Sequence, residues 1–349
     1  LIERFGADEL EQAVDFLIDY TERRTRSAIS RLPSGAFTGE GTIDDDGVER
    51  DRPLTVRVEV RVDDGSLIID FTGTDVQAKG PINASRAQAT SAAVYGSRVI
   101  LDDADITINE GVFSPLQLVL PEGSLVNPAW PAAVNARGIT MMAVIEALLE
   151  ALSKQQPHRA VADSPANHVM TISTKDPVTG SFRVYMDNDY GGAGARATKD
   201  GVDATGTAFL AGRTFTVSAE GIEQEHPVML EHYRLRVDSG GPGRHRGGLG
   251  AERTVRLLQD ATASMRADKS RFAPRGIDGG GEGAPSGWVV NAGRPDEQVL
   301  RSKETNITLR AGDTLTMLTA GGGGFGDPRD RDRALVVADV RDGRVSIEQ

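Results

Sequence analysis

Glycine limits how this chain can fold, because 40 of its 349 residues are glycine and many of them stand in short runs. Six of them lie in the stretch HPVMLEHYRLRVDSGGPGRHRGGLG, residues 226–250. Its first half is a strand-like run of bulky and charged residues, and its second half is a loop with arginines between the glycines. Glycine permits positive φ angles and a close approach of the backbone to another group. The stretch therefore predicts a rigid element that leads into a loop built from backbone.

Short strand-like segments separated by glycine turns fill the chain from Ala166 onward. This pattern is typical of a sandwich or a distorted barrel. The strands expected in this region are Val169–Ser173, Phe182–Met186, Met229–Val237, Glu252–Leu258, Thr262–Arg266, Trp288–Val290, Ile307–Leu309 and Thr314–Leu318. Residues 161–349 are therefore predicted to form a β-rich region with long loops that contain glycine and arginine.

The first 36 residues predict a helix. Apolar residues recur at helical spacing from Leu10 to Leu32, and Asp8 followed by Glu11 is typical of a capping box. The opening LIERFG has the pattern of the last turn of a helix that ends at Gly6. We therefore expect this region to continue an N-terminal part that is absent from the sequence.

Residues 37–160 predict strands and two packing helices. Apolar and polar residues alternate from Leu54 to Val62, and an Asp-Asp-Gly turn follows at residues 63–65. Helices are expected from Asn83, as the cap, to Leu101 and from about Ile139 to Lys154, both on one face of the sheet. The whole chain is thus predicted to be α+β: an N-terminal helix, a mixed sheet covered by two helices, and a β-rich half.

The run Asp44–Asp45–Asp46, followed by Gly47, is typical of a second turn. A calcium loop would need further ligands at loop spacing, and none follows. The sequence therefore favours a solvated turn.

Composition excludes several classes of partner and site. Lys and Arg number 39 against 51 Asp and Glu, a net charge of -12, which argues against binding nucleic acid or an anionic membrane. The chain has no cysteine, so disulfides, thiolate nucleophiles and Cys-ligated metals are excluded together. No apolar run approaches a membrane span, and no signal peptide opens the sequence. A cytoplasmic location is the expectation.

A first candidate site is the segment DNDYGGAGARATKDG, residues 187–201. A carboxylate beside a glycine loop can act as a base or orient an amide, which makes Asp189 a candidate catalytic residue. Gly191, Gly192 and Arg196 are candidate contacts for a substrate or an anion. A glycine-rich connection with charges at the surface is the alternative.

A second candidate site is SGGPGRHRGGLG, residues 239–250. Arg244 and Arg246 are candidate anion contacts, and the preceding Asp238 is a candidate for orienting substrate. The backbone and side chains of Ser239, Gly240 and Gly241 are expected to contribute. The loop is not a P-loop, because no GKS or GKT follows and a strand comes next.

Arg137, with Asn135, precedes the second packing helix and is a third candidate for anion contact. The five histidines, His158, His168, His226, His232 and His245, show no metal-site spacing. No metal ligand is therefore assigned in this sequence.

Five ordered segments resemble the hydantoinase B/5-oxoprolinase family, which includes the alpha subunits of acetone and acetophenone carboxylases. They are IDFTGTDVQAKGPIN at 69–83, NEGVFSPLQLVLPEGSLVNPAWPAAV at 109–134, YGGAGAR at 190–196, LRVDSGGPGRHRGGLG at 235–250 and GGGGFGDP at 321–328. The sequence departs from the commoner family pattern at PAAVNARGIT and at residues 207–216, which puts the substrate in doubt more than the fold.

The resemblance implies a subunit of an ATP-dependent cyclic amidohydrolase that opens a hydantoin or 5-oxoproline ring. It also implies that an ATP-binding hydantoinase A-type partner subunit handles the nucleotide and that a divalent metal binds in the absent N-terminal part. Two alternatives stay open at this point. One is an ATP-dependent ketone carboxylase subunit, and the other is a non-catalytic half that docks the ATP-using subunit. We expect the sequence to be inactive without its missing portion.

Overall fold

The Asp-Asp-Gly turn fixes the register of the first sheet. The structure, a computed structural model, describes residues 1–101, 103–176, 178–205 and 216–348. Asp64 and Gly65 both have positive φ, 37° and 71°, as a two-residue hairpin turn requires, and they join β2 (Leu54–Asp63) to β3 (Ser66–Asp70). β1 (Gly35–Ile43) pairs antiparallel with β2, and β4 (Leu116–Val119) pairs parallel with β3. The predicted mixed sheet is confirmed.

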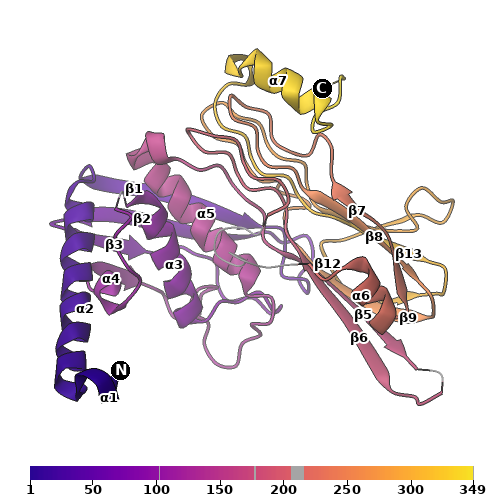
Figure 1. The fold of residues 1–349 in the computed structure, drawn as a ribbon, viewed down its shortest axis with the longest axis horizontal. Helices are drawn as coiled ribbons and strands as arrows, with labels where there is room; N and C mark the ends of the chain where they lie inside the picture. The colour runs from indigo at the N-terminus through magenta and orange to yellow at the C-terminus, as the bar shows by residue number, and fades with distance from the viewer. Residues whose placement is uncertain (102, 177, 206–215, 349) are drawn as a thin grey trace.

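The two predicted packing helices are present, and glycines of β1 bring one of them onto the sheet. α5 (Gly138–Gln155) crosses β1 so closely that a Cβ at Gly39 would lie 2.0 Å from the carbonyl oxygen of Ala147. α3 (Arg86–Ile100) lies beside α5 and packs against it (Figure 1). The predicted cap of α3 is wrong: Ser85 is the N-cap, in a capping box with Gln88, because the Asn83 side chain is buried and donates to backbone carbonyls.

The helix end predicted at Gly6 is present, and a second helix follows it. α1 (Ile2–Phe5) and α2 (Ala7–Ser30) meet at Gly6, whose φ is 83°. Gly6 is also the N-cap of α2, so the predicted Asp8 capping box does not form. The residues of α2 that are buried all lie in its second half, where the short α4 (Glu110–Phe113) packs against it (Figure 1).

The acidic run at residues 44–46 is not the solvated turn predicted for it. Asp44 and Asp46 are 2% and 1% exposed. Asp44 accepts hydrogen bonds from the backbone and hydroxyl of Ser270, and Asp46 accepts from the backbone of Gly80. These carboxylates act as acceptors for backbone N–H groups of distant segments, which the local sequence does not reveal.

The second half of the chain is a sandwich of two sheets. One sheet has the order β12-β9-β5-β6 and the other β11-β10-β13-β8-β7. All eight predicted strands are present. The strands are β5 (His168–Lys175), β6 (Phe182–Asp189), β7 (Val228–Leu235), β8 (Ala251–Leu257), β9 (Ala261–Arg266), β10 (Gly287–Val290), β11 (Gln298–Leu300), β12 (Lys303–Leu309) and β13 (Thr314–Leu318).

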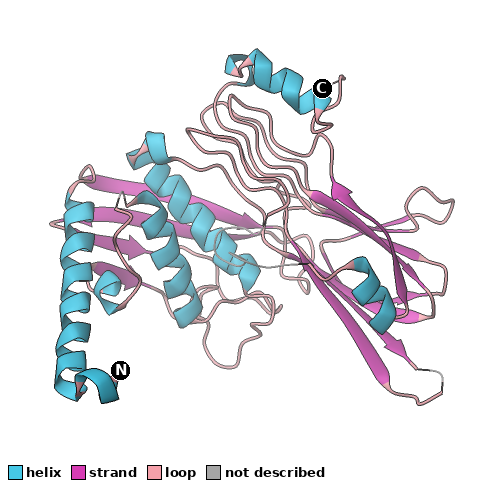
Figure 2. Ribbon diagram, in the orientation of Figure 1, coloured by secondary structure: helices cyan, strands magenta, loops and turns pink. Residues whose placement is uncertain are grey.

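The two sheets share one apolar core. Trp288, the largest fully buried side chain, packs there with Met170 of β5 and Met317 of β13. The short helix α6 (Ala219–Glu225) contributes Ile222 to the same core. Figure 2 shows the strands of the sandwich grouped apart from the helices of the first half. Among the described residues, no helix has the length and apolar character that crossing a membrane requires.

Long glycine-rich segments run side by side from the sandwich up to the C-terminal helix α7 (Arg333–Arg341) (Figure 1). We call residues 191–195, 239–250, 274–284 and 320–326 the glycine stack. Its segments bond backbone to backbone: Gly248 N–H donates to Ala193, Gly322 N–H to Gly248, and Gly241 N–H to Gly322. A Cβ at Gly192 would lie 1.8 Å from the Gly248 oxygen. The glycines are therefore required by the approach of neighbouring backbones.

We predict that Gly322→Ala destabilises the fold by about 3 kcal/mol, because its Cβ would overlap buried backbone that cannot move aside. That Cβ would lie 2.1 Å from the Ala193 oxygen. Gly287→Ala, in β10, is the matched control, since its Cβ would meet only the Leu318 side chain at 3.7 Å. Urea denaturation of both variants measures the difference. Equal stabilities would contradict the packing role.

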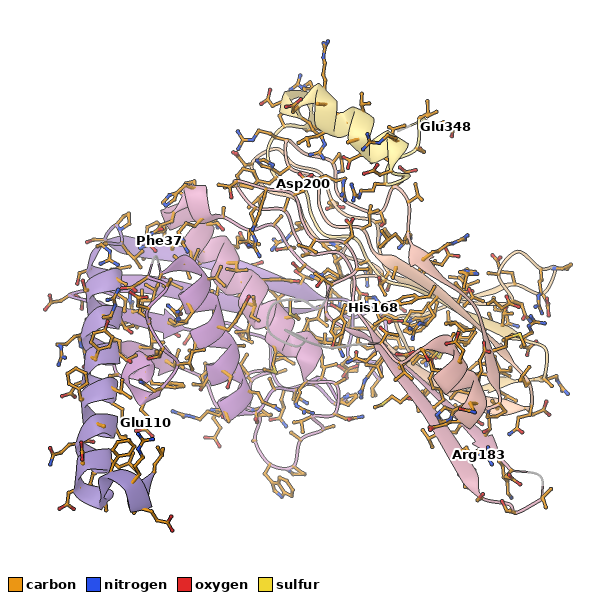
Figure 3. The ribbon with its side chains drawn as sticks, viewed as in Figure 1. Phe37, Glu110, His168, Arg183, Asp200 and Glu348 are labelled. Atoms are coloured by element: carbon orange, nitrogen blue, oxygen red, sulfur yellow. The ribbon has the colours of Figure 1, made fainter. Side chains whose placement is uncertain are left out.

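His168 makes the free energy of unfolding depend on pH. Its side chain is fully buried next to Trp288, at the centre of the molecule (Figure 3), and burial lowers its pKa to about 3. The unfolded chain binds a proton on this histidine below about pH 6.5 while the folded chain does not, so stability falls as pH falls from 6.5 toward 3.

Between pH 7 and pH 5, buried His168 should lower the free energy of unfolding of the wild type by about 2 kcal/mol. We predict that His168→Leu abolishes this part of the loss. Urea denaturation of the wild type and the variant at both pH values provides the measurement. His158→Leu, which changes a histidine outside the core, is the control and should leave the pH dependence as it is in the wild type. A pH dependence that survives in His168→Leu would show that other groups cause it.

Candidate functional site

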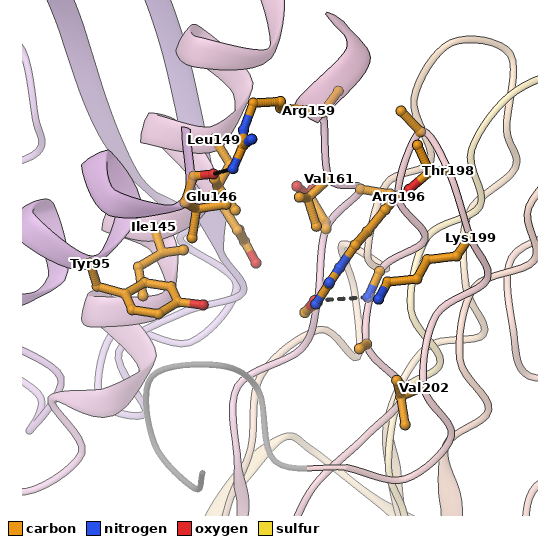
Figure 4. Close-up of a pocket in the computed structure, with 18 of the residues that line it drawn as sticks. Tyr95, Ile145, Glu146, Leu149, Arg159, Val161, Arg196, Thr198, Lys199 and Val202 are labelled. Carbon is orange, nitrogen blue, oxygen red and sulfur yellow. Dashed lines mark hydrogen bonds between the residues drawn. The ribbon is translucent and has the colours of Figure 1, made fainter. Parts of the chain in front are cut away.

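A cavity of about 790 Å³ lies between α5 and the glycine stack. Met142, Ile145, Glu146 and Leu149 line it from α5, and their spacing of three and four residues places them on one face of the helix. Figure 4 shows this face opposite Val161, Arg196, Lys199 and Val202. The wall combines apolar residues with polar and charged ones, so it can contact both the apolar and the polar parts of a small molecule.

Glu146 is a carboxylate buried in this wall. It is 2% exposed, and its Oε2 lies 2.7 Å from the ammonium group of Lys269, which is also buried. Among the described residues, its Oε1 has no hydrogen-bond partner. Burial raises the pKa of Glu146, against the attraction of Lys269 that lowers it. A carboxyl group with a raised pKa in a cavity is suited to proton transfer.

Lys269, the partner of Glu146, has a backbone conformation that costs free energy. Lys269 has a φ of 67°, which residues other than glycine adopt at a cost. Its ammonium group also donates to the Thr42 carbonyl at 3.2 Å, so β1 and α5 together hold it. Charge from Glu146 and Asp163 raises the pKa of Lys269, against its burial. The lysine therefore stays charged beside the carboxyl group.

Asp163 joins the cavity wall to the glycine stack. Its side chain accepts from Nε of Arg275 at 2.8 Å, and its carbonyl accepts from the Gly323 N–H at 3.0 Å. Arg275 also reaches Glu150 of α5, at 3.3 Å. This arrangement ties the helix face and the glycine stack together, so that the cavity keeps a defined width.

Arg196 and Lys199 supply positive charge on the side opposite α5. They belong to a tight turn in which each backbone N–H donates to the carbonyl of the other, at 2.9 and 3.4 Å. The charge of Arg196 lowers the pKa of Tyr95 across the cavity, but burial of the phenol raises it by more. The cavity thus combines exposed cations with two buried carboxyl groups, those of Glu146 and Asp163, a set that can bind a polar or anionic group and move a proton.

The structure places the five predicted glycine and serine contacts inside the glycine stack. Gly192 and Gly241 donate their N–H groups to Ala320 and Gly322, and Ser239 donates its hydroxyl to Arg236 and accepts from Gly250. The residues in this set are Gly191, Gly192, Ser239, Gly240 and Gly241, and all of them are buried. Their contacts give them a packing role, and a role in binding stays a prediction.

Asp189 lies at the end of β6 and does not line the cavity. It is 2% exposed, accepts from the Tyr233 hydroxyl at 3.1 Å and pairs with Arg253 at 3.2 Å. Burial raises the pKa of Asp189, and the hydrogen bond from Tyr233 opposes this. Arg253, itself 1% exposed, also pairs with Asp187. The catalytic role predicted for Asp189 would have to act through these partners.

Arg246 and Asp238 bind the C-terminal segment at the outer end of the glycine stack. The Arg246 side chain lies 3.2 Å from Asp203 and 3.6 Å from Asp339 of α7. Asp238 accepts from the backbone N–H of Ser346 at 2.7 Å. Asp200, near α7 in Figure 3, forms a bidentate pair with Arg331. These charges fasten α7 to the glycine stack.

The remaining predicted contacts lie apart from one another. Arg244 stacks over the Phe325 ring, and Arg137 lines a second cavity at the start of α5. Of the predicted site residues, only Arg196 lines the main cavity. Residues that the sequence analysis missed there are Glu146, Asp163 and Lys199. A glutamate within the apolar face of a helix was a signal that could have identified Glu146.

Comparison with known proteins assigns the chain to a family. The family model for hydantoinase B/oxoprolinase matches residues 1–328. The chain belongs to the hydantoinase B/oxoprolinase family. It is 34% identical over its whole length to the B subunit of a candidate D-/L-hydantoinase of Pseudomonas sp. (strain NS671), and 28% identical to the beta subunit of caprolactamase from Pseudomonas jessenii. The chain spans 60% and 61% of these two proteins.

Two solved structures show the same fold. The crystal structure of the ATP-dependent caprolactamase from Pseudomonas jessenii matches 99% of the chain with a TM-score of 0.85 and 25% identity, and the chain covers 61% of it. Nucleotide-free acetone carboxylase matches 94% of the chain with a TM-score of 0.80 and 20% identity, and the chain covers 50% of it. In the described part of this family member, no three His, Asp or Glu side chains are placed to hold a metal.

We predict that Arg246→Ala lowers the free energy of unfolding by about 2 kcal/mol, because it removes a buried guanidinium that contacts Asp203 and Asp339, while Arg344 and Arg331 still pair with these carboxylates. Arg244→Ala is the matched control: its guanidinium is exposed, and its polar contact is a 3.5 Å bond to the Ala197 carbonyl. Denaturation in urea compares the two. If Arg244→Ala destabilised the chain as much as Arg246→Ala, the contacts of Arg246 with Asp203 and Asp339 would not explain the loss of stability.

Proposed function

We propose that this chain is part of a subunit of an ATP-dependent cyclic amidohydrolase that opens a ring of the hydantoin or 5-oxoproline type. The observation that carries the proposal is the match of the whole chain, in sequence and fold, to the subunit of an ATP-dependent caprolactamase. The B subunit of the candidate hydantoinase adds support at higher identity. Both relatives are named for enzymes that act on cyclic amides.

The chemistry explains why such an enzyme would use ATP. An amide carbon is a poor electrophile, and ATP would supply the phosphoryl group that converts the amide into an O-phosphorylated imidate, which is more readily attacked. Addition of water to the carbon then releases a proton, and breaking of the C–N bond consumes one at the ring nitrogen. A second water frees the carboxylate and phosphate. A site for these steps needs a proton carrier and donors for the developing negative charge.

The cavity between α5 and the glycine stack is the proposed place for the ring. Glu146 would carry the proton, because its carboxyl is buried, lines the cavity and has an oxygen without a described partner. Arg196 and Lys199 would contact the charged group from the opposite wall. Asp189, Arg244, Arg246 and Asp238 lie outside the lining of this cavity. Any contribution from them would be indirect.

ATP and any metal would be held elsewhere in the assembly. The proposal keeps an ATP-binding partner subunit of the hydantoinase A type. The caprolactamase and hydantoinase relatives are named as subunits, which supports a partner. A divalent metal would bind in the part of the relatives that this chain does not span.

An ATP-dependent ketone carboxylase subunit is the alternative that the fold also allows, since acetone carboxylase shares it at 20% identity. Substrate tests separate the two reactions. The protein, produced with its ATP-using partner, is supplied with hydantoins, 5-oxoproline and small lactams, and separately with ketones and labelled bicarbonate. Ring-opened product with stoichiometric phosphate supports the amidohydrolase. Label in a carboxylated ketone would overturn it, as would turnover in neither panel with an intact complex.

We predict that Glu146→Gln in the active complex lowers kcat by about a hundredfold or more while KM changes little, because proton transfer is lost and binding is not. The acid limb of the kcat/KM profile should lie above the ordinary range of a glutamate and disappear in the variant. Turnover in steady state over a range of pH measures both.

The matched control is Asp268→Asn. Asp268 and Lys303 form a second buried carboxylate–lysine pair, at 3.1 Å, that does not line the cavity. Asp268→Asn should lower the stability of the fold by a comparable amount and leave the pH profile of kcat/KM unchanged. If both variants lost turnover only in proportion to their loss of folded protein, Glu146 would be structural.

A further inference from the structure

A second cavity, of about 310 Å³, lies where α5 begins beside the sandwich. Its wall contains Arg137 and Asn135 from the entry to α5, Gln88 from α3, and Asn167 and Arg266 from the sandwich. No residue lines both this cavity and the larger one. The second cavity is therefore a separate compartment, and half of the residues that line it are polar or charged.

Two guanidinium groups face this cavity without a counter-charge. Arg137 and Arg266 have no carboxylate at salt-bridge distance among the described residues. Burial lowers the pKa of Arg266, and the like charge of Arg137 lowers it further. The chain has an excess of acidic residues, 51 against 39 basic ones, so carboxylates are abundant elsewhere on its surface. An arginine pair that no carboxylate neutralises favours an anion from outside.

Neighbouring polar groups hold the side chains of this cavity in place. The Arg266 side chain donates to the Asn135 carbonyl at 3.4 Å, which holds it at the edge of the cavity. The Asn167 amide donates to Asn188 at 2.8 Å, which fixes its orientation. A planar guanidinium binds two oxygens of a phosphate or carboxylate at once, and two guanidinium groups from different walls can hold one such ion.

We propose that this second cavity binds a small oxyanion, such as phosphate or a carboxylate, between Arg137 and Arg266. This site lies outside the lining of the proposed reaction cavity and goes beyond the proposed function. It needs neither ATP nor a partner subunit, so its test can succeed or fail independently of the amidohydrolase proposal.

The test is binding of inorganic phosphate to the 349-residue chain, followed by ³¹P NMR line broadening and by calorimetry. Arg137→Gln and Arg266→Gln should each weaken binding by about tenfold or more, since each removes a charge-assisted, two-point contact. Arg266→Lys keeps the charge but not the planar fork and should fall between the wild type and Arg266→Gln. Acetate and bicarbonate should compete with phosphate for the same site.

Two arginines outside this cavity are also changed. Arg183→Gln, far along the β6 hairpin (Figure 3), is the control and should bind phosphate as the wild type does, whereas Arg196→Gln reports on binding in the larger cavity. Circular dichroism and melting curves establish that each variant is folded. Loss of binding in Arg196→Gln but not in Arg137→Gln would place the ion in the larger cavity and overturn the proposal. Absence of saturable binding in the wild type, or equal weakening in all variants, would also overturn it.

Discussion

The approach of backbone to backbone in the glycine stack holds the two halves of this molecule in place. Side chains pack the core of the first half and the core of the sandwich. The segments of the glycine stack, in contrast, contact one another through their backbones. Gly322 N–H donates to Gly248, and Gly323 N–H donates to Asp163 in the wall of the main cavity. The cavity therefore exists because glycine permits these contacts.

Buried charge pairs complete the connection between the halves. Lys269, from the segment after β9, pairs with Glu146 of α5. Lys303 pairs with Asp268, whose carboxylate also accepts a hydrogen bond from the backbone N–H of Asp44 in the first half. Asp44, at the end of β1, accepts hydrogen bonds from the segment after Lys269. Breaking one partner of such a pair leaves a buried charge, so these contacts specify one arrangement of the two halves even where their net contribution to stability is small.

Local patterns in the sequence predicted most of the elements but not how they meet. The alternation in β2, its Asp-Asp-Gly turn and the apolar face of α5 depend on neighbouring residues, and the structure bears them out. β1 escaped prediction because Gly39 and Gly41 suggest a turn, whereas they serve the approach of α5. Asp44 was predicted to lie in a solvated turn, because the partners that bury it lie more than 200 residues away in sequence.

The candidate site was likewise predicted only in part from the sequence. Glycine and arginine motifs correctly indicated loops built from backbone, but motif residues alone could not say which of them would meet. Arg196 lines the main cavity. Arg246 instead pairs with Asp339 of α7, a contact that only the folded chain reveals. Glu146 carries no motif and became a candidate only through its burial beside Lys269.

The glycine stack also affects how stability varies with temperature. On unfolding, exposed apolar surface raises the heat capacity and exposed peptide groups lower it. The sandwich core, with Trp288 and its methionine neighbours, contributes the first effect, whereas the stack mainly exposes backbone. The region that shapes the cavity should therefore have a flatter stability curve than the cores on either side, and it should lose less stability on cooling.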